Sequence, residues 1–199
     1  MQEIALPRFA LAILTLCVLA LSSLSLGSQA VAAPVGNPNV PAPAKPVDVD
    51  RYVGRYYELA RYENIFQRGC EAVSADYSKI PGGMIRIVNI CHDKGVDGPS
   101  RSVNGRAKLV EGSRNAKFKV SFLGPAFLGD YWVLDRAEDY SWAIVSDRSG
   151  KFLWLLHRQP TPGPAEITFL VTRAKTLGFN TALLRFTKQA PLAKGEAAR

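Results

Sequence analysis

The amino-acid sequence predicts an all-β fold: an eight-stranded antiparallel up-and-down β-barrel with one C-terminal α-helix packed on the outside. Three observations lead to this prediction, namely short runs in which apolar and polar residues alternate, tight turns between those runs, and one amphipathic stretch near the end of the chain. Alternation with a period of two is typical of strands with one buried and one solvated face. Hairpin-linked strands leave two open edges, and closure into a barrel removes both of them.

Residues 1–32 are expected to be a secretory signal peptide. A polar start ends at Arg8, an apolar stretch runs to Leu26, and small residues around Ala30 suit cleavage. A retained membrane anchor is the alternative, because the apolar stretch approaches the length of a membrane span. Lipid anchoring at Cys17 is not expected, since Leu16 stands where a small residue is needed and more apolar sequence follows.

The proline-rich segment 33–46 is expected to be a disordered tether, because its prolines, glycine and asparagine favour an extended chain. The barrel is expected to span 47–189, and the polar residues 190–199 to form a disordered tail. At the start of the barrel, Asp48 is placed to cap a short turn that leads into the first strand.

The strand candidates are bounded by turn signals such as Pro81–Gly83, Glu111–Ser113 and Asp147–Gly150. A barrel of about eight strands has an interior that just holds one small ligand. The expected strands are 54–62, 71–80, 84–92, 101–110, 116–123, 130–135, 141–146 and 151–158.

The last elements follow a proline-rich break. Residues 165–177 predict a helix with one apolar stripe, made by Ile167, Leu170, Val171 and Ala174. Gly178 is well placed to end this helix. Residues 181–187 could return to the barrel as an extra strand.

Two cysteines in an exported chain favour a disulfide, here Cys70–Cys91, with two buried thiols as the alternative. A hairpin about Gly82 brings the two residues nearly opposite each other, within the span that a disulfide bridges. The formal net charge of +8 suits contact with an anionic membrane, although a solvated surface is the favoured explanation. Nucleic acid is not an expected partner, since no basic cluster with interleaved aromatic residues is present.

Alternation along the strands also identifies the side chains that point inward. Glu58 is expected inside the barrel, where a carboxylate must find an arginine or a ligand head group. The other candidates for a ligand cavity could equally form an ordinary filled core; they are Tyr77, Ile87, Phe118, Val120, Phe122, Tyr131, Val133 and Trp154.

Four segments carry a family resemblance: Gly54–Arg61, Val120–Phe127, Tyr131–Val145 and Phe152–Pro160. In this order and spacing they resemble the lipocalin family, in particular the branch of bacterial outer-membrane lipocalins and apolipoprotein D. The resemblance implies that Gly54, Tyr56 and Arg158 are structural, with the arginine stacked on the aromatic ring at the closed end. Tyr56 stands where the family usually has tryptophan, so the stack is expected to be smaller.

The resemblance further implies an exported carrier, in the periplasm or at the periphery of an outer membrane, that holds a fatty acid or (lyso)phospholipid. An exported barrel that binds a protein partner, or haem through one histidine, is the alternative. An enzyme is the least expected reading, because His92 and His157 are the only histidines and no nucleotide or metal motif accompanies them. No metal or cofactor is expected.

Overall fold

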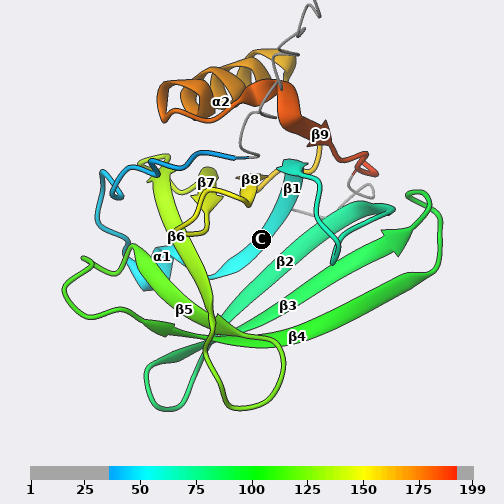
Figure 1. Cartoon of the computed structure of the whole chain (residues 1–199). Coiled ribbons are helices and arrows are strands. Elements are labelled where there is room, and N and C mark those ends of the chain that lie inside the picture. Colours follow the sequence, from blue (N-terminus) through cyan, green and yellow to red (C-terminus); the bar gives the residue numbers. More distant parts are fainter. Residues whose placement is uncertain (1–35, 192–199) are drawn as a thin grey trace, which may run out of the picture. The chain divides into compact units, whose positions relative to one another are not determined.

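Eight antiparallel strands close into a barrel in the computed structural model, which describes residues 36–191 (Figure 1). Neighbours follow the chain order from β2 to β8, then β1, and pairing of β1 with β2 closes the ring. A ninth strand, β9 (Leu184–Phe186), lies beside β1. The prediction of the barrel is confirmed. Its strands are β1 (Gly54–Tyr62), β2 (Cys70–Ile80), β3 (Met84–Asp93), β4 (Ser100–Leu109), β5 (Lys117–Ser121), β6 (Gly129–Arg136), β7 (Trp142–Ser146) and β8 (Leu153–His157).

A short helix, α1 (Val49–Tyr52), leads into β1. The Asp48 carboxylate caps it by accepting a hydrogen bond from the Asp50 backbone N–H at 2.9 Å. This satisfies one of the free donors at the helix start. The buried ring of Tyr52 thereby comes to lie in the barrel interior.

The hairpin of β2 and β3 carries the disulfide. The two strands are joined by a turn in which Gly82 and Gly83 have φ angles of 82° and 70°, a region that glycine adopts readily. The register places Cys70 opposite Asp93, two residues beyond Cys91. The Cys70 and Cys91 Cα atoms are 5.3 Å apart and the sulfurs are bonded, which confirms the predicted bridge.

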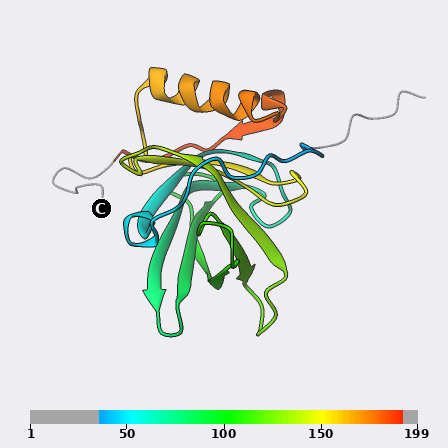
Figure 2. The same cartoon turned by 90° about the vertical axis from the view of Figure 1, so that its left-hand side faces the viewer.

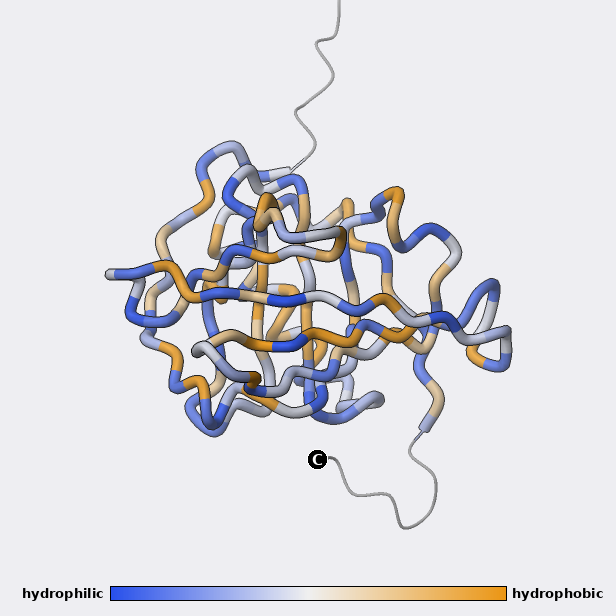
Figure 3. Tube along the Cα trace, turned by 90° about the horizontal axis from the view of Figure 1, so that it is seen from below, coloured by the Kyte–Doolittle hydropathy of each residue, from blue (hydrophilic) through white to orange (hydrophobic). Residues whose placement is uncertain are grey.

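Apolar side chains form two main layers, one inside the barrel and one between the barrel wall and α2 (Pro164–Thr176). Figure 2 shows α2 lying across the outside of the barrel, and Figure 3 shows apolar and polar positions alternating along the strands. Leu170 and Ala174 of the expected stripe are fully buried against this wall, and Ile167 and Val171 are partly buried. The helix ends before Gly178, whose φ angle is 90°.

A bulge interrupts β1 between Glu58 and Ala60. An extra residue in a strand reverses which face the following side chains occupy. Leu59, Ala60 and Tyr62 therefore pack in the layer beneath α2, and Arg61 turns to the same side as Glu58.

Residues 36–46 lie along the barrel, in contrast to the expected disordered tether. The Asn37 backbone N–H donates to the Gly150 carbonyl at 3.0 Å, and Ala44 donates to Leu134 at 3.2 Å. Prolines lack an N–H, but their carbonyl oxygens remain acceptors. The carbonyl of Pro46 accepts from the Arg136 guanidinium at 2.9 Å, which is how a proline-rich segment docks without strand pairing.

The remaining expectations concern the ends of the chain. Residues 181–187 begin as a short 3-10 turn (Thr181–Leu183) before β9. The expected signal peptide, Cys17 and the tail from residue 192 onward lie outside the described residues. Within 36–191, no helix is long and apolar enough to span a bilayer.

Candidate functional site

Arg158 closes one end of the barrel. Its guanidinium carbon lies 3.7 Å from the centre of the Tyr56 ring, the stack implied by the family resemblance. The same guanidinium donates hydrogen bonds to carbonyls at the end of α1, at 3.0 Å to Arg51 and 3.1 Å to Tyr52. Gly54, two residues before Tyr56, has a φ angle of 102°, a backbone conformation that residues other than glycine rarely adopt. These contacts join Arg158 to β1 and to the end of α1.

Beside this closure lies a small interior cavity of about 10 Å³. The volume is only just enough for one water molecule, so side chains fill most of the closed half of the barrel. Four predicted cavity residues take part in it, and three others were not predicted. The lining residues are Tyr52, Tyr77, Ile85, Ile87, Ala107, Phe118 and Tyr131.

Three tyrosine hydroxyls meet within this apolar interior. The Tyr131 hydroxyl lies 2.7 Å from that of Tyr52 and 2.9 Å from that of Tyr77. Burial raises the pKa of Tyr77 to about 12, and raises the pKa values of Tyr52 and Tyr131 well above the usual tyrosine value. All three hydroxyls are therefore neutral at pH 7. They provide a small polar group of donors and acceptors inside the apolar barrel.

The other predicted cavity residues are placed differently. Val120 and Val133 are buried in the interior layer, and Trp154 packs partly against it. Phe122 follows β5, because the strand ends at Ser121 rather than at residue 123 as expected. Its ring lies over Gly105, which pairs with Ile87 of the interior layer. The Ser121 hydroxyl donates to the Gly124 carbonyl at 3.0 Å and turns the chain away. Phe122 is 39% exposed and borders an open hollow together with exposed residues of β3 and β4.

A buried polar cluster lies around Glu58. Its carboxylate accepts from the Arg61 guanidinium at 2.7 Å and from the side-chain amide of Gln67 at 2.6 Å. The Gln67 side-chain oxygen in turn accepts from the Trp154 indole N–H at 2.9 Å. Glu58 thus has the arginine partner that its burial requires. Sequence reasoning missed Arg61 because the bulge in β1 breaks the alternation, and missed Gln67 because it comes from a loop.

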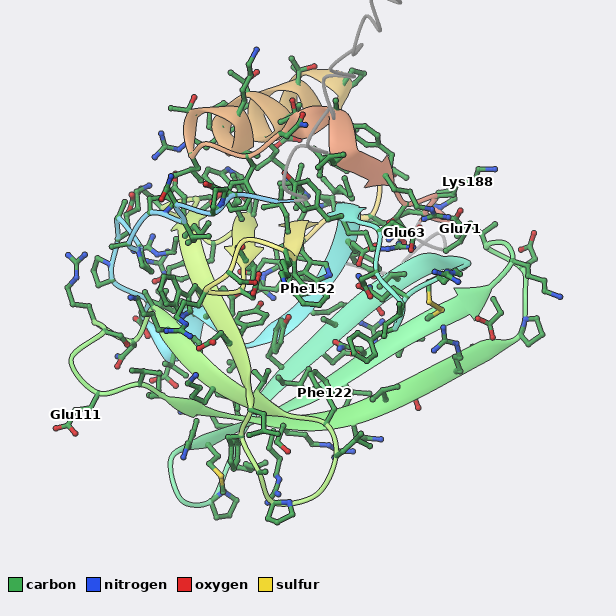
Figure 4. All side chains as sticks on the ribbon, in the orientation of Figure 1. Glu63, Glu71, Glu111, Phe122, Phe152 and Lys188 are labelled. Atoms are coloured by element: carbon green, nitrogen blue, oxygen red, sulfur yellow. A yellow bond between two sulfur atoms is a disulfide. The ribbon has the colours of Figure 1, made fainter. Side chains whose placement is uncertain are left out.

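Aromatic rings continue from this cluster. Phe152, labelled in Figure 4, stacks on Trp154 with 5.6 Å between ring centres, and Phe66 lies 6.5 Å from Phe152. These residues come from the loop between β1 and β2 and from the start of β8. Because neighbouring strands run in opposite directions, both segments lie at the end of the barrel opposite Arg158. An amphipathic molecule that enters from this end meets aromatic rings and a polar cluster before the apolar interior.

Neither histidine lies in this interior arrangement. His157 is buried on the side of β8 that faces α2, where its Nε2 atom is 3.5 Å from Glu166. His92 lies near the loop after β3, with its Nδ1 atom 3.1 Å from the Gly98 carbonyl oxygen. In residues 36–191, the one cluster with metal-ligating side chains consists of Asp93 and the two disulfide sulfurs. Sulfurs in a disulfide are not the thiolates that metals require.

Comparison with known proteins gives a consistent result. A model of the lipocalin-like domain matches residues 47–189. The chain is 36% identical to the outer membrane lipoprotein Blc of Vibrio cholerae, over 78% of this chain and 90% of that protein. It is 31% identical to mouse apolipoprotein D, over 74% of this chain and 82% of that protein. Lobster apocrustacyanin A1 shares the fold with a TM-score of 0.55 and 18% identity, over 77% of this chain and 93% of the crustacyanin.

Proposed function

Because the chain belongs to the lipocalin family, we propose that it is an exported carrier that binds one fatty acid or (lyso)phospholipid inside its barrel. Lipocalins are generally binding proteins, and a barrel of this size suits one small ligand. The observation that carries the proposal is the layout of the interior: apolar side chains in the closed half, then a polar cluster around Glu58 toward the opposite end. This order matches a molecule with an apolar tail and a polar head.

Tail binding requires side chains to move, because the interior cavity is only about 10 Å³. Phe118 and Tyr131 border this cavity, and rotation of their rings would lengthen it toward Trp154. Burying about ten methylenes at roughly 0.8 kcal/mol each yields roughly 8 kcal/mol. Lost freedom of the ligand and the rearranged rings offset much of this. Affinity in the micromolar range is therefore expected, which suits a carrier that must release its ligand.

The proposed place of action is the bacterial cell envelope. The relative from Vibrio cholerae is named an outer membrane lipoprotein. In this chain the expected signal peptide supports export to the periplasm or the outer-membrane periphery, without lipid anchoring at Cys17. Transport or storage of lipid during envelope maintenance fits this location.

The test is displacement of a fluorescent fatty acid by natural lipids, measured with wild type and two interior variants. Val120→Asp places a charge on the interior face, and Ala107→Leu adds bulk beside the cavity without adding charge. Both should weaken binding at least about ten-fold, because a charge or extra volume opposes tail burial. Ser78→Asp, on the exposed face of β2, is the charge-matched control and should bind like wild type.

Circular dichroism should show that each variant keeps its fold. Organic extraction of the purified protein followed by mass spectrometry identifies any lipid that it carries. If folded Val120→Asp and Ala107→Leu bind as wild type does, or if natural lipids do not compete, the interior is a filled core and the proposal is wrong.

A further inference from the structure

The loop between β5 and β6, residues 122–128, exposes an uncharged apolar tip. Leu123 is 89% exposed and Leu128 is 84% exposed, and Phe122 adds a partly exposed ring. No charged side chain occurs in this loop. Figures 1 and 2 both show it projecting from the barrel on the side away from α2. Clustered exposed apolar residues of this kind mark an interaction surface.

Contacts with the barrel wall hold this loop in its projecting position. The Arg106 guanidinium donates to the Gly124 carbonyl at 3.2 Å. The ring of Phe127 lies 5.6 Å from the Arg106 guanidinium carbon and 5.0 Å from the Lys108 ammonium. Phe127 is therefore drawn back to the wall, whereas Leu123 and Leu128 are left pointing into solvent. The apolar tip of the loop is therefore exposed to solvent and does not pack against the barrel.

Beside the tip, the exposed face of β3 and β4 carries cations without anionic partners. Arg86 lies directly opposite Arg106 in the strand register, and Lys108 lies opposite Lys119, which pairs with Asp130. Like charges in directly opposite positions repel each other. Within residues 36–191, Arg86, Arg106 and Lys108 make no ion pair; Arg86 donates to the Asn104 side chain at 3.1 Å.

An open hollow of about 560 Å³ lies between the cations and the apolar loop. Arg86, Asn104, Arg106 and Ser121 contribute polar groups to it, and Ile80 and Phe122 contribute apolar ones. Phosphate oxygens suit guanidinium and amide donors, and anionic lipid surfaces attract exposed basic residues. The hollow and the loop thus combine the two properties of a phospholipid surface, negative head groups next to an apolar layer.

We propose that loop 122–128 and the cations Arg86, Arg106 and Lys108 form a docking surface for a bilayer containing anionic phospholipid. Leu123 and Leu128 enter the edge of the acyl layer, while lipid phosphates occupy the hollow and neutralise the opposed arginines. The loop joins β5 and β6 at the end of the barrel that also carries the loop between β1 and β2, but the proposal does not depend on a ligand inside the barrel. It explains why a loop at the end of β5 remains apolar although it lies in water.

The experiment is co-sedimentation of the protein with vesicles of phosphatidylcholine alone, or of phosphatidylcholine with phosphatidylglycerol. Wild type should bind the anionic vesicles at least about ten-fold more tightly, and added salt should weaken this binding. Leu123→Ser combined with Leu128→Ser should remove most of it, because both side chains are exposed and lose only their contact with lipid. Arg86→Gln should weaken binding about five-fold, the contribution expected of one basic residue near an anionic surface.

Matched controls lie on α2, on the other side of the barrel (Figure 2). Phe169→Ser removes an exposed apolar side chain there, and Lys175→Gln removes an exposed charge; both should bind vesicles like wild type. Equal binding of wild type to the two vesicle types, or equal loss in the control variants, overturns the proposal. So does self-association that depends on Leu123 and Leu128 in the absence of vesicles, since a second copy would then cover the loop. Fatty-acid binding in solution, measured on the same variants, reports separately on the barrel interior.

Discussion

At the scale of single residues, the interior depends on polar atoms that satisfy one another within apolar surroundings. Tyr131 is the shared partner of two other buried tyrosines, and Glu58 is neutralised by Arg61. A buried polar group without a partner destabilises the native state, whereas a paired one costs little. Each of these buried polar groups therefore needs its specific partner for the native state to be stable.

Stability should decrease at alkaline pH because of the buried tyrosines. Burial raises the pKa of Tyr77 to about 12, whereas an unfolded tyrosine titrates near about 10. Between these pH values the unfolded chain loses protons that the native protein retains, so the free energy of unfolding is complete below about pH 10 and falls as pH rises toward about 12. Urea denaturation at a series of pH values measures this.

The Tyr77→Phe variant separates this effect from general alkaline unfolding. At pH 7 it should be less stable by about 1 kcal/mol, because one hydrogen bond to Tyr131 is lost. Its decline above about pH 10 should be shallower than that of wild type, since one of the retained protons is gone. A decline as steep as that of wild type would show that other groups control alkaline stability.

At the scale of elements, β2 and β3 are held by local features as well as by their pairing. The hairpin of β2 and β3 has its glycine turn at one end and the disulfide at the other. In β1, the bulge lets a single strand contribute both to the interior and to the layer beneath α2. The helix adds no side chain to the interior layer, but its Leu170 and Ala174 cover the wall that β1, β6, β7 and β8 form.

Replacing both cysteines, by Cys70→Ser with Cys91→Ser, should lower the free energy of unfolding by about 3 kcal/mol. The bridge closes a loop between residues separated by 21 positions, and the chain-entropy model assigns about this value to a loop of that size. Urea denaturation with and without reductant tests it. Reductant should lower the free energy of unfolding of the wild type to that of the double variant and leave the double variant unchanged. Two free thiols in the exported wild type would contradict the bridge.

At the scale of the whole molecule, closure of the barrel depends on the C-terminal segment. β1 and β2 pair only over Gly54–Tyr57, and beyond this they diverge. The Ala72 N–H donates to the Lys188 carbonyl at 2.7 Å, and the Gln189 amide donates to the carbonyls of Glu58 and Val73, both at 2.8 Å. The end of the chain thus supplies the hydrogen bonds that the two diverging strands cannot give each other.

Gln189→Ala should therefore reduce stability by about 1–3 kcal/mol, the range for leaving buried polar groups without partners. Hydrogen exchange of the backbone amides should become faster in β1 beyond Tyr57 and at the start of β2, where the strands diverge. Gln159→Ala, at an exposed position, is the matched control and should change neither measurement. If Gln189→Ala leaves both unchanged, closure does not depend on this bridge.

The sequence by itself determined the elements of this protein. The bounds of β1 agree with the prediction, and the other barrel strands differ from it by at most two residues at an end. Period-two alternation and the glycine-containing turns are local properties, so they are visible without a structure. The disulfide was also predictable, because a hairpin with a short turn fixes which residues of its two strands face each other.

Only the tertiary structure decided how the site is assembled. Alternation gives the face of each side chain only while a strand continues, so the bulge after Glu58 brought Arg61 to the same side as Glu58. Composition marked residues 33–46 as a tether, but within 36–46 the Pro46 carbonyl found a partner on the barrel and the Asn37 side-chain amide found one at the end of α2. The cavity is small because of how the rings of Phe118 and its tyrosine neighbours pack. Such packing depends on contacts between residues far apart in the chain, which no local pattern records.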